Sequence, residues 1–115
     1  MREGAWIREL GAAVIVCDRQ GTILEMNERA CQTHEKDGGR ALVGKSLLDC
    51  HPEAARAKLV ALLESGAENA YTIEKNGVKK LIWQAPWFEG GQRMGLVEIV
   101  LIVPFEMPHF VRKPQ

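Results

Sequence analysis

The chain has 115 residues and a mass of 12.8 kDa, which leaves room for one domain with a single core and excludes a multidomain enzyme. Fifteen basic residues balance fifteen acidic ones, so the net charge is zero and no global positive field favours nucleic acid or an anionic membrane surface. The longest apolar run, 99–103, is far shorter than a membrane-spanning helix, and no signal-peptide stretch follows the first residues. Three cysteines, an odd number, indicate free thiols. We therefore expect a cytoplasmic protein.

The first third of the chain predicts a short helix, a hairpin and a second short helix. Residues 2–10 place apolar side chains among charges, a spacing typical of an amphipathic helix or arm that is too short to be stable alone. Two runs rich in β-branched residues, 12–17 and 22–26, flank a turn and predict a β-hairpin. Asn27 is a good helix N-cap and opens a predicted helix over 27–34.

The middle of the chain contains its strongest helical signal. Residues 36–39 predict a loop, and 42–49 predict a helical turn followed by a turn capped by Ser46. The segment 52–65 carries apolar residues at positions i, i+4, i+7 and i+8, and Gly66 follows it. One amphipathic helix with one buried face is therefore expected here.

The last third predicts three antiparallel strands. Residues 69–75 are joined by Asn76-Gly77, a strong two-residue hairpin signal, to a long strand over 78–88. The turn 89–91 leads into a final strand over 93–103. The order of elements is thus a hairpin, several short helices, one longer helix and a three-stranded meander.

In this order and spacing the chain resembles a PAS domain, the small sensor module of signalling proteins. The resemblance rests on the hairpin Val14–Met26 with its Asp18-x-x-Gly21-x-Ile23 core, on Asn27 directly after it, and on the segment Leu42–Leu47 before the longer helix. It covers Gly11–Val103. It implies an α+β fold whose five-stranded antiparallel sheet has the order 2-1-5-4-3. Short helices and one longer helix would pack on one face, with a ligand or cofactor cavity between them.

The resemblance divides the chain into three parts. Residues 1–10 would form an amphipathic cap or dimerisation segment, 11–103 the PAS domain, and 104–115 a tail with three prolines. Prolines disfavour the helical linker through which most PAS modules feed an effector domain. Either the chain is a free-standing sensor that signals through contact with a partner protein in trans, which we expect, or it is a fragment of a longer protein.

The two long closing strands carry apolar residues on both faces, and each face therefore needs a cover. One face is predicted to line a cavity that accepts a small apolar or amphipathic ligand, and the other to form a homodimer interface. The alternative cover for the second face is the N-terminal segment or the tail. The predicted cavity lining is Ile15, Cys17, Leu24, Ala30, Val43, Leu47, Leu59, Leu63, Trp83, Ile99 and Leu101. The predicted dimer interface is Trp6, Ile7, Leu10, Ile82, Phe88, Leu96, Val100 and Ile102.

The pair Cys50-His51 at the start of the longer helix is the most conspicuous chemical feature. The resemblance implies that His51 would be the axial ligand if the protein bound haem, although the helix body 52–65, where that ligand usually sits, contains no histidine. A single histidine at a helix start is more often a cap or a surface residue. Cys50 beside an imidazolium is a candidate redox-sensing thiol, but no resolving cysteine can be identified.

Three other kinds of site find little support. Cys31, His34, Cys50 and His51 match no structural zinc spacing, so no metal is expected. The Asn-Cys-Arg-Phe-Leu-Gln segment of flavin photosensors is absent. With no nucleophile elbow, P-loop or paired carboxylates, the chain is not expected to be an enzyme.

The hypothesis that competes with a ligand-binding sensor is an interaction domain with a filled core, in which the ring of Trp83 would occupy the cavity.

Overall fold

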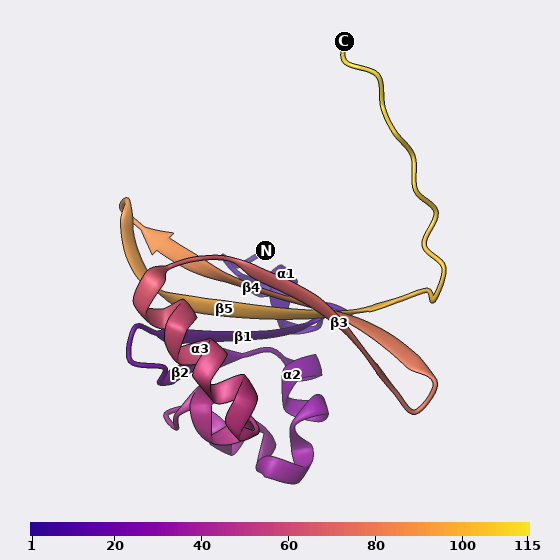
Figure 1. The fold of residues 1–115 in the computed structure, drawn as a ribbon. Coiled ribbons are helices and arrows are strands. Elements are labelled where there is room, and N and C mark those ends of the chain that lie inside the picture. The colour runs from indigo at the N-terminus through magenta and orange to yellow at the C-terminus, as the bar shows by residue number, and fades with distance from the viewer.

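The computed structural model describes residues 1–115 except for the side chain of Cys50. Two strands, a group of helical elements and three strands follow one another along the chain after a short first helix, and Figure 1 shows how the helices and strands are arranged. In chain order they are α1 (Ala5–Arg8), β1 (Ala13–Asp18), β2 (Ile23–Met26), α2 (Glu28–Thr33), η1 (Glu35–Asp37), η2 (Gly39–Leu42), η3 (Leu47–Cys50), α3 (Glu53–Ser65), β3 (Asn69–Lys75), β4 (Val78–Glu89) and β5 (Gln92–Val103).

The strands form a single antiparallel sheet in the order β2-β1-β5-β4-β3, which confirms the predicted fold class. α2, the 3-10 turns and α3 cover one side of it (Figure 1). We call this side the inner face; its strand residues include Ala13, Ile15, Cys17, Leu96 and Val100. The outer face carries the alternate residues, namely Val14, Val16, Val97, Ile99 and Leu101 on β1 and β5 and Leu81, Trp83 and Ala85 on β4.

The core lies between the inner face and the helices. Its most deeply buried large side chains come from separate elements, Ile23 from β2, Leu47 from η3, Leu59 from α3 and Leu96 from β5, together with Cys17 from β1. Burial of each large aliphatic side chain contributes about 1.5–3 kcal/mol. The helical layer is therefore held to the sheet chiefly by these contacts.

Two local sequence signals form the structures they predict. Asp18 Oδ1 accepts hydrogen bonds from the backbone N–H groups of Gln20 and Thr22, both at 2.9 Å, and so closes the β1–β2 turn. Gly66 ends α3 with φ +72°, and the guanidinium of Arg93 donates to the carbonyl oxygen of Leu63 in the last turn of that helix at 2.9 Å. β5 thereby holds the C-terminal end of α3.

The side chain of Asn27 joins the N-terminal segment to the sheet. Its Oδ1 accepts from Val14 N at 2.9 Å and from Ala30 N at 3.0 Å, so it also caps α2. Its Nδ2 donates to the carbonyl oxygens of Ala12 at 2.8 Å and Ile7 at 3.0 Å. One buried amide therefore fixes α1, β1 and α2 relative to one another.

Two predicted elements differ in detail from the structure. The N-terminal amphipathic helix is a single turn, α1, because a segment of this length has too few internal hydrogen bonds to extend further. The predicted loop 36–39 is largely 3-10 turn, in η1 and η2, with Gly38 between the two turns and Gly39 at the start of η2, both at positive φ. In the part of the chain that the structure describes, no helix has the length and hydropathy of a membrane span.

Beyond β5, the C-terminal residues extend away from the sheet, as the yellow end of the ribbon in Figure 1 shows. The ammonium of Lys79 on β4 donates to the carbonyl oxygen of Phe105 at 3.3 Å. This hydrogen bond connects the first residues of the tail to β4.

Candidate functional site

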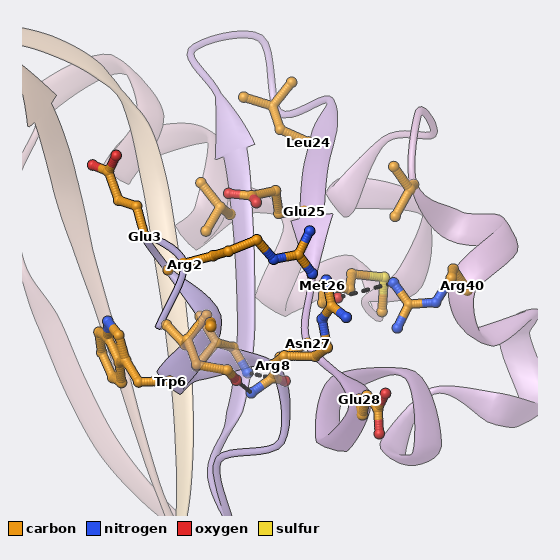
Figure 2. Close-up of a pocket in the computed structure, with 16 residues that line it drawn as sticks. Arg2, Glu3, Trp6, Arg8, Leu24, Glu25, Met26, Asn27, Glu28 and Arg40 are labelled. Atoms are coloured by element: carbon orange, nitrogen blue, oxygen red, sulfur yellow. Dashed lines mark hydrogen bonds between the residues drawn. The ribbon is translucent and has the colours of Figure 1, made fainter.

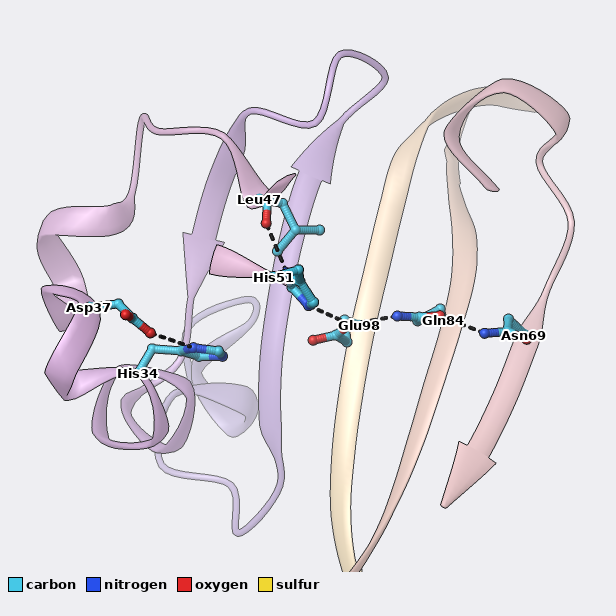
Figure 3. Close-up of polar contacts among 7 residues, drawn as sticks. All are labelled: His34, Asp37, Leu47, His51, Asn69, Gln84 and Glu98. Carbon is cyan, nitrogen blue, oxygen red and sulfur yellow. Dashed lines mark hydrogen bonds and ion pairs between the residues drawn. The ribbon is translucent and has the colours of Figure 1, made fainter. Parts of the chain in front are cut away.

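A chain of polar side chains crosses the inner face of the sheet (Figure 3). Gln84 on β4 and Glu98 on β5 are cross-strand neighbours and are only 2% and 4% exposed. Gln84 Nε2 donates to Glu98 Oε2 at 2.7 Å, and Asn69 Nδ2 on β3 donates to Gln84 Oε1 at 2.8 Å. Buried polar groups are tolerated when they are hydrogen-bonded in this way, so the three strands share one connected network.

His51 connects this network to the helical layer. It lies between η3 and α3, and its Nδ1 is 2.9 Å from the carbonyl oxygen of Leu47. Its Nε2 is 3.6 Å from Glu98 Oε2. Both neighbours are acceptors, and only the protonated imidazolium presents an N–H on each ring nitrogen. The geometry therefore favours the charged form of His51.

The pKa values of both partners follow this arrangement. Burial alone lowers the pKa of His51, but the hydrogen bond and charge of Glu98, with the Leu47 carbonyl, outweigh it and raise the pKa above its ordinary value of 6.5. Burial alone raises the pKa of Glu98, but hydrogen bonds from His51 and Gln84 and the His51 charge outweigh it and lower the pKa. The two groups thus stabilise each other's charged forms.

The network ends at a pocket of about 300 Å³ between α3 and the β3–β4 edge of the inner face. Its lining residues are Ala54, Ala55, Lys58, Asn69, Tyr71 and Gln84. The pocket thus combines small apolar side chains with a cation, two amides and a phenol. Burial and the charge of Glu98 raise the pKa of Tyr71, which keeps its hydroxyl protonated. This volume is at the lower end of the range of small-molecule sites.

A larger pocket of about 920 Å³ lies on the other side of the sheet, between the N-terminal segment and the β1–β2 hairpin. Figure 2 shows that Arg2 and Arg8 reach it from the N-terminal segment and Arg40 from η2, and Glu3, Glu25 and Glu28 also line it. Arg40 Nη1 donates to the carbonyl oxygen of Met26 at 3.3 Å. The pocket therefore contains charges of both signs.

The predicted cavity residues do not share one surface. Those that meet in the core are Ile15, Cys17, Ala30, Leu47, Leu59 and Leu63. Leu24 and Val43 line the larger pocket instead, and Trp83, Ile99 and Leu101 lie on the outer face. Trp83 is 39% exposed, so its ring does not fill the core.

The predicted dimer residues are also divided between surfaces. Ile82, Phe88, Leu96, Val100 and Ile102 lie on the inner face, where Ile82 and Leu96 are buried. Trp6, Ile7 and Leu10 belong to the N-terminal segment, and Trp6 and Ile7 line the pocket above the outer face of β1.

The two faces of β4 and β5 are the reverse of the prediction. Both strands are apolar on both sides, so alternation alone does not distinguish the two faces. The prediction placed the face that contains Gln84 and Glu98 in the dimer interface, away from the core. The structure places Glu98 opposite Ile15 on the inner face. The charge is accommodated there because His51 and Gln84 supply the partners that water would otherwise provide.

The geometry of His51 does not fit an axial haem ligand. The contact of Nδ1 with the Leu47 carbonyl would be compatible with iron ligation through Nε2, but Nε2 faces Glu98 at 3.6 Å and has no open position for an iron ion. The redox hypothesis depends on the side chain of Cys50, which lies outside the part of the chain that the structure describes. Burial raises the pKa of the Cys17 thiol to about 11 and keeps it protonated. Among the described side chains, no group of three or more His, Cys, Asp or Glu is placed to hold a metal ion.

Sequence reasoning missed Asn69, Gln84 and Glu98 as site residues. The available signal was the presence of an amide and a carboxylate in the apolar middle of two strands, 78–88 and 93–103. Such residues in a sheet interior indicate a hydrogen-bonded network, which is a common location of functional chemistry.

The chain is similar to known proteins over most of its length. A family model described as PAS fold matches residues 7–100. Among solved structures, the chain is similar to a sensory box sensor histidine kinase from Vibrio cholerae, with 18% identity, a TM-score of 0.63, and coverage of 84% of this chain and 86% of that chain. It is also similar to the PAS domain of BvgS from Bordetella pertussis, with 16% identity, a TM-score of 0.63 and coverage of 85% and 81%. No curated protein matches the chain.

A third similar structure is the PAS domain of an HTR-like protein from Haloarcula marismortui, with 15% identity, a TM-score of 0.59, and coverage of 86% of this chain and 87% of that chain. At these identities the structural similarity shows the fold, and the family model independently covers most of the chain. The resemblance predicted from the sequence is confirmed. The chain belongs to the PAS fold family, whose domains are typical sensor modules of signalling proteins.

Proposed function

We propose that the protein is a non-catalytic sensing module that binds a small amphipathic molecule in the pocket beside α3 and signals through contacts with other proteins. The observation that carries this proposal is the position of Gln84. Its amide belongs to the lining of the pocket and also donates to Glu98 at 2.7 Å. A molecule in the pocket would therefore touch a network that continues to the helical layer.

The pocket favours a ligand with one anionic or acceptor end and a short apolar body. Lys58 offers a cation, and the Asn69 amide and the protonated Tyr71 hydroxyl offer uncharged donors. Ala54 and Ala55 on α3 offer a small apolar wall. A short-chain carboxylic acid combines these two properties.

A change at the pocket would reach the helical layer through His51. This residue joins Glu98 on β5 to Leu47 in η3, directly before α3. A ligand that draws Gln84 away from Glu98 would alter the partners of the His51 ion pair and shift the packing of η3 and α3 over the sheet. Such a change is a shift between conformational populations and requires no catalysis.

A second candidate is an interaction module that binds no small molecule. The packing of the central core favours it, because Ile23, Leu47, Leu59 and Leu96 are fully buried between the helical layer and the sheet. In that case the 300 Å³ pocket at the edge of α3 would hold only water.

The experiment that separates the two candidates is thermal denaturation with short-chain mono- and dicarboxylates, hexanoate and adipate among them, followed by native mass spectrometry of any complex. The diagnostic variant is Ala55→Trp, which places an indole in the pocket from a half-buried position on α3. Its matched control is Ala57→Trp, the same substitution at an exposed position of the same helix.

We expect a ligand to raise the melting temperature of the wild type and of Ala57→Trp but not that of Ala55→Trp. Ligand binding at 100 times its Kd stabilises the folded state by about 2.7 kcal/mol, which such a measurement resolves. If no carboxylate shifts the wild type and no small molecule is retained on purification, the interaction module is the correct function. Equal stabilisation of all three proteins would place the ligand elsewhere.

A further inference from the structure

The C-terminal segment 104–111 carries large apolar side chains into solvent. Phe105, Met107, Phe110 and Val111 are all exposed, Phe110 by 73% and Val111 by 86%. The guanidinium of Arg112 lies over the Phe110 ring at 5.9 Å from its centroid, which leaves most of the ring uncovered. Four large apolar residues within so short a segment form an apolar patch of the kind that usually marks an association surface. We call this segment the arm.

A second apolar surface lies on the outer face over β4 and β5. Trp83 and Leu101 are 39% and 42% exposed, and Leu81 and Ile99 beside them are half-buried. The N-terminal segment lines a pocket together with Val14, Val16 and Leu24 of β1 and β2, and neither Trp83 nor Leu101 belongs to that lining. The same chain thus presents an apolar arm and an apolar sheet surface that are not in contact with each other.

The length of the arm fits this surface. Eight extended residues span about 26 Å, and the four intervals of a five-stranded sheet span about 19 Å. The arm could therefore cross the whole width of one sheet. Its two prolines favour the extended form needed for this, because proline fixes φ and also restricts the residue before it.

The direction of the arm favours docking on a second copy over docking on its own sheet. Pro104 follows β5 directly, and Lys79 Nζ holds the carbonyl oxygen of Phe105 at 3.3 Å. From there the chain runs away from its own domain (Figure 1). Docking on its own outer face would require a reversal at Pro104 and the loss of the Lys79 contact. Docking on a second copy requires neither.

We propose that two copies of this chain exchange their arms, so that Phe110 and Val111 of one copy pack on the outer face around Trp83 and Leu101 of the other. Because each copy supplies one arm and one face, the exchange closes a two-fold dimer and buries both apolar surfaces. This proposal specifies the protein contacts of the proposed function. It does not depend on the ligand pocket, since the arm would dock on the outer face and the pocket lies on the inner face.

Photo-crosslinking of the full chain tests which molecule each arm touches. Phe110→p-benzoylphenylalanine is prepared in unlabelled and in uniformly ¹⁵N-labelled form, and the two are mixed and allowed to exchange before irradiation. We expect position 110 to crosslink to the tryptic peptide 81–93, which contains Trp83. Peptide pairs that combine one light and one heavy partner would show arm exchange. If every crosslink joins peptides of the same label, the arm folds back on its own chain and the proposal is wrong.

Sedimentation equilibrium tests the contribution of the arm to assembly. Loss of two large apolar contacts on each arm in Phe110→Ser/Val111→Ser is expected to raise the dimer Kd by about 100-fold or more. Arg112→Ser/Lys113→Ser changes the same tail without removing apolar area and should leave the Kd within about threefold. Because the arm lies outside the core, all variants should keep the wild-type melting temperature when monomeric. A strictly monomeric wild type, or a Kd that the apolar variant leaves unchanged, would contradict the proposal.

Discussion

His51 Nε2 lies 3.6 Å from Glu98 Oε2, and this ion pair connects the segment before α3 to the centre of the sheet. Its two side chains are 12% and 5% exposed, so water screens the interaction little. The other ring nitrogen of His51 faces the carbonyl oxygen of Leu47 at 2.9 Å. The ring can donate to both neighbours only when it is protonated, and the pair is therefore a titratable link between the two layers of the domain.

The stability of the fold should consequently depend on pH. The pKa of His51 is raised on folding, so its contribution is complete below its ordinary value of 6.5 and is lost as the pH rises through the folded pKa. The pKa of Glu98 is lowered, so its contribution is complete above its ordinary value of 4.5 and is lost as the pH falls through the folded pKa. The pair thus stabilises the fold most between pH 4.5 and 6.5, and urea denaturation should show stability decreasing on either side.

Substitution of single histidines shows which group causes the pH dependence of stability. His51→Ala leaves Glu98 buried without its counter-ion, and we expect a loss of about 3 kcal/mol near pH 6 with a flatter profile above it. His109→Ala in the exposed tail is the matched control and should reproduce the wild type. The charge of His34 also acts on Glu98, so His34→Ala should weaken the profile without abolishing it. A wild-type profile that His51→Ala fails to flatten would show that another group titrates.

The same geometry predicts the outcome of a search for haem. Both nitrogens of His51 face protein acceptors, and the helix body that follows, Glu53–Ser65, contains no histidine. Protein purified from cells supplied with a haem precursor should therefore show no Soret band in its absorbance spectrum. A Soret band that His51→Ala removes would contradict this expectation and would require the Glu98 pair to open.

Locally encoded features of the fold could be predicted from the sequence. Gly66 ends α3, and the Asn76-Gly77 turn has positive φ at both residues, because each depends on residue types within a few positions. The sheet order followed from the resemblance of these elements, in sequence, to a known family. These signals required no knowledge of distant contacts.

The partners of Gln84 and Glu98 in the inner site could not be predicted, because these residues meet only in the folded chain. Nothing near Glu98 in the sequence indicates that His51 will neutralise it, so its charge was placed outside the core. The pairing of β4 with β5 is also shifted by an irregularity between Trp87 and Phe88. If the pairs were counted from the β4–β5 turn without this irregularity, Gln84 would lie opposite Val97. Gln84 and Glu98 would then lie on opposite faces of the sheet.

Asn27 should be among the least replaceable polar residues of the fold. Its side chain makes four hydrogen bonds, with Val14, Ala30, Ala12 and Ile7, three of them to buried residues. Asn27→Ala leaves these groups without partners and should cost about 3 kcal/mol in urea denaturation.

Asn27→Asp separates the two roles of this residue. The carboxylate keeps the acceptor that caps α2 at Ala30 N but loses the donors to Ile7 and Ala12. We expect it to release the N-terminal segment, seen as faster tryptic cleavage after Arg8, while α2 remains folded by hydrogen exchange. If both variants leave cleavage after Arg8 at the wild-type rate, the amide does not anchor this segment.

Gly95 should tolerate no side chain, although its φ lies outside the left-handed region. A Cβ at this position would collide with the carbonyl oxygen of Cys17 and the backbone of Asp18 on β1, and neither can move without disrupting the β1–β5 pairing. The same carbonyl of Cys17 accepts a hydrogen bond from Trp87 Nε1 at 2.9 Å. The close approach of three strands therefore depends on the absence of a side chain at Gly95.

Gly95→Ala is accordingly expected to destabilise the fold by at least about 3 kcal/mol, since the strands must separate to relieve the overlap. Gly11→Ala is the matched control, because its Cβ would meet no atom within 4 Å and its φ is not left-handed. Urea denaturation followed by tryptophan fluorescence measures both, and Trp87→Phe shows how much of the loss comes from its hydrogen bond, about 1 kcal/mol. Equal stability of the two alanine variants would mean that β1 and β5 can adjust their spacing at Gly95 without cost.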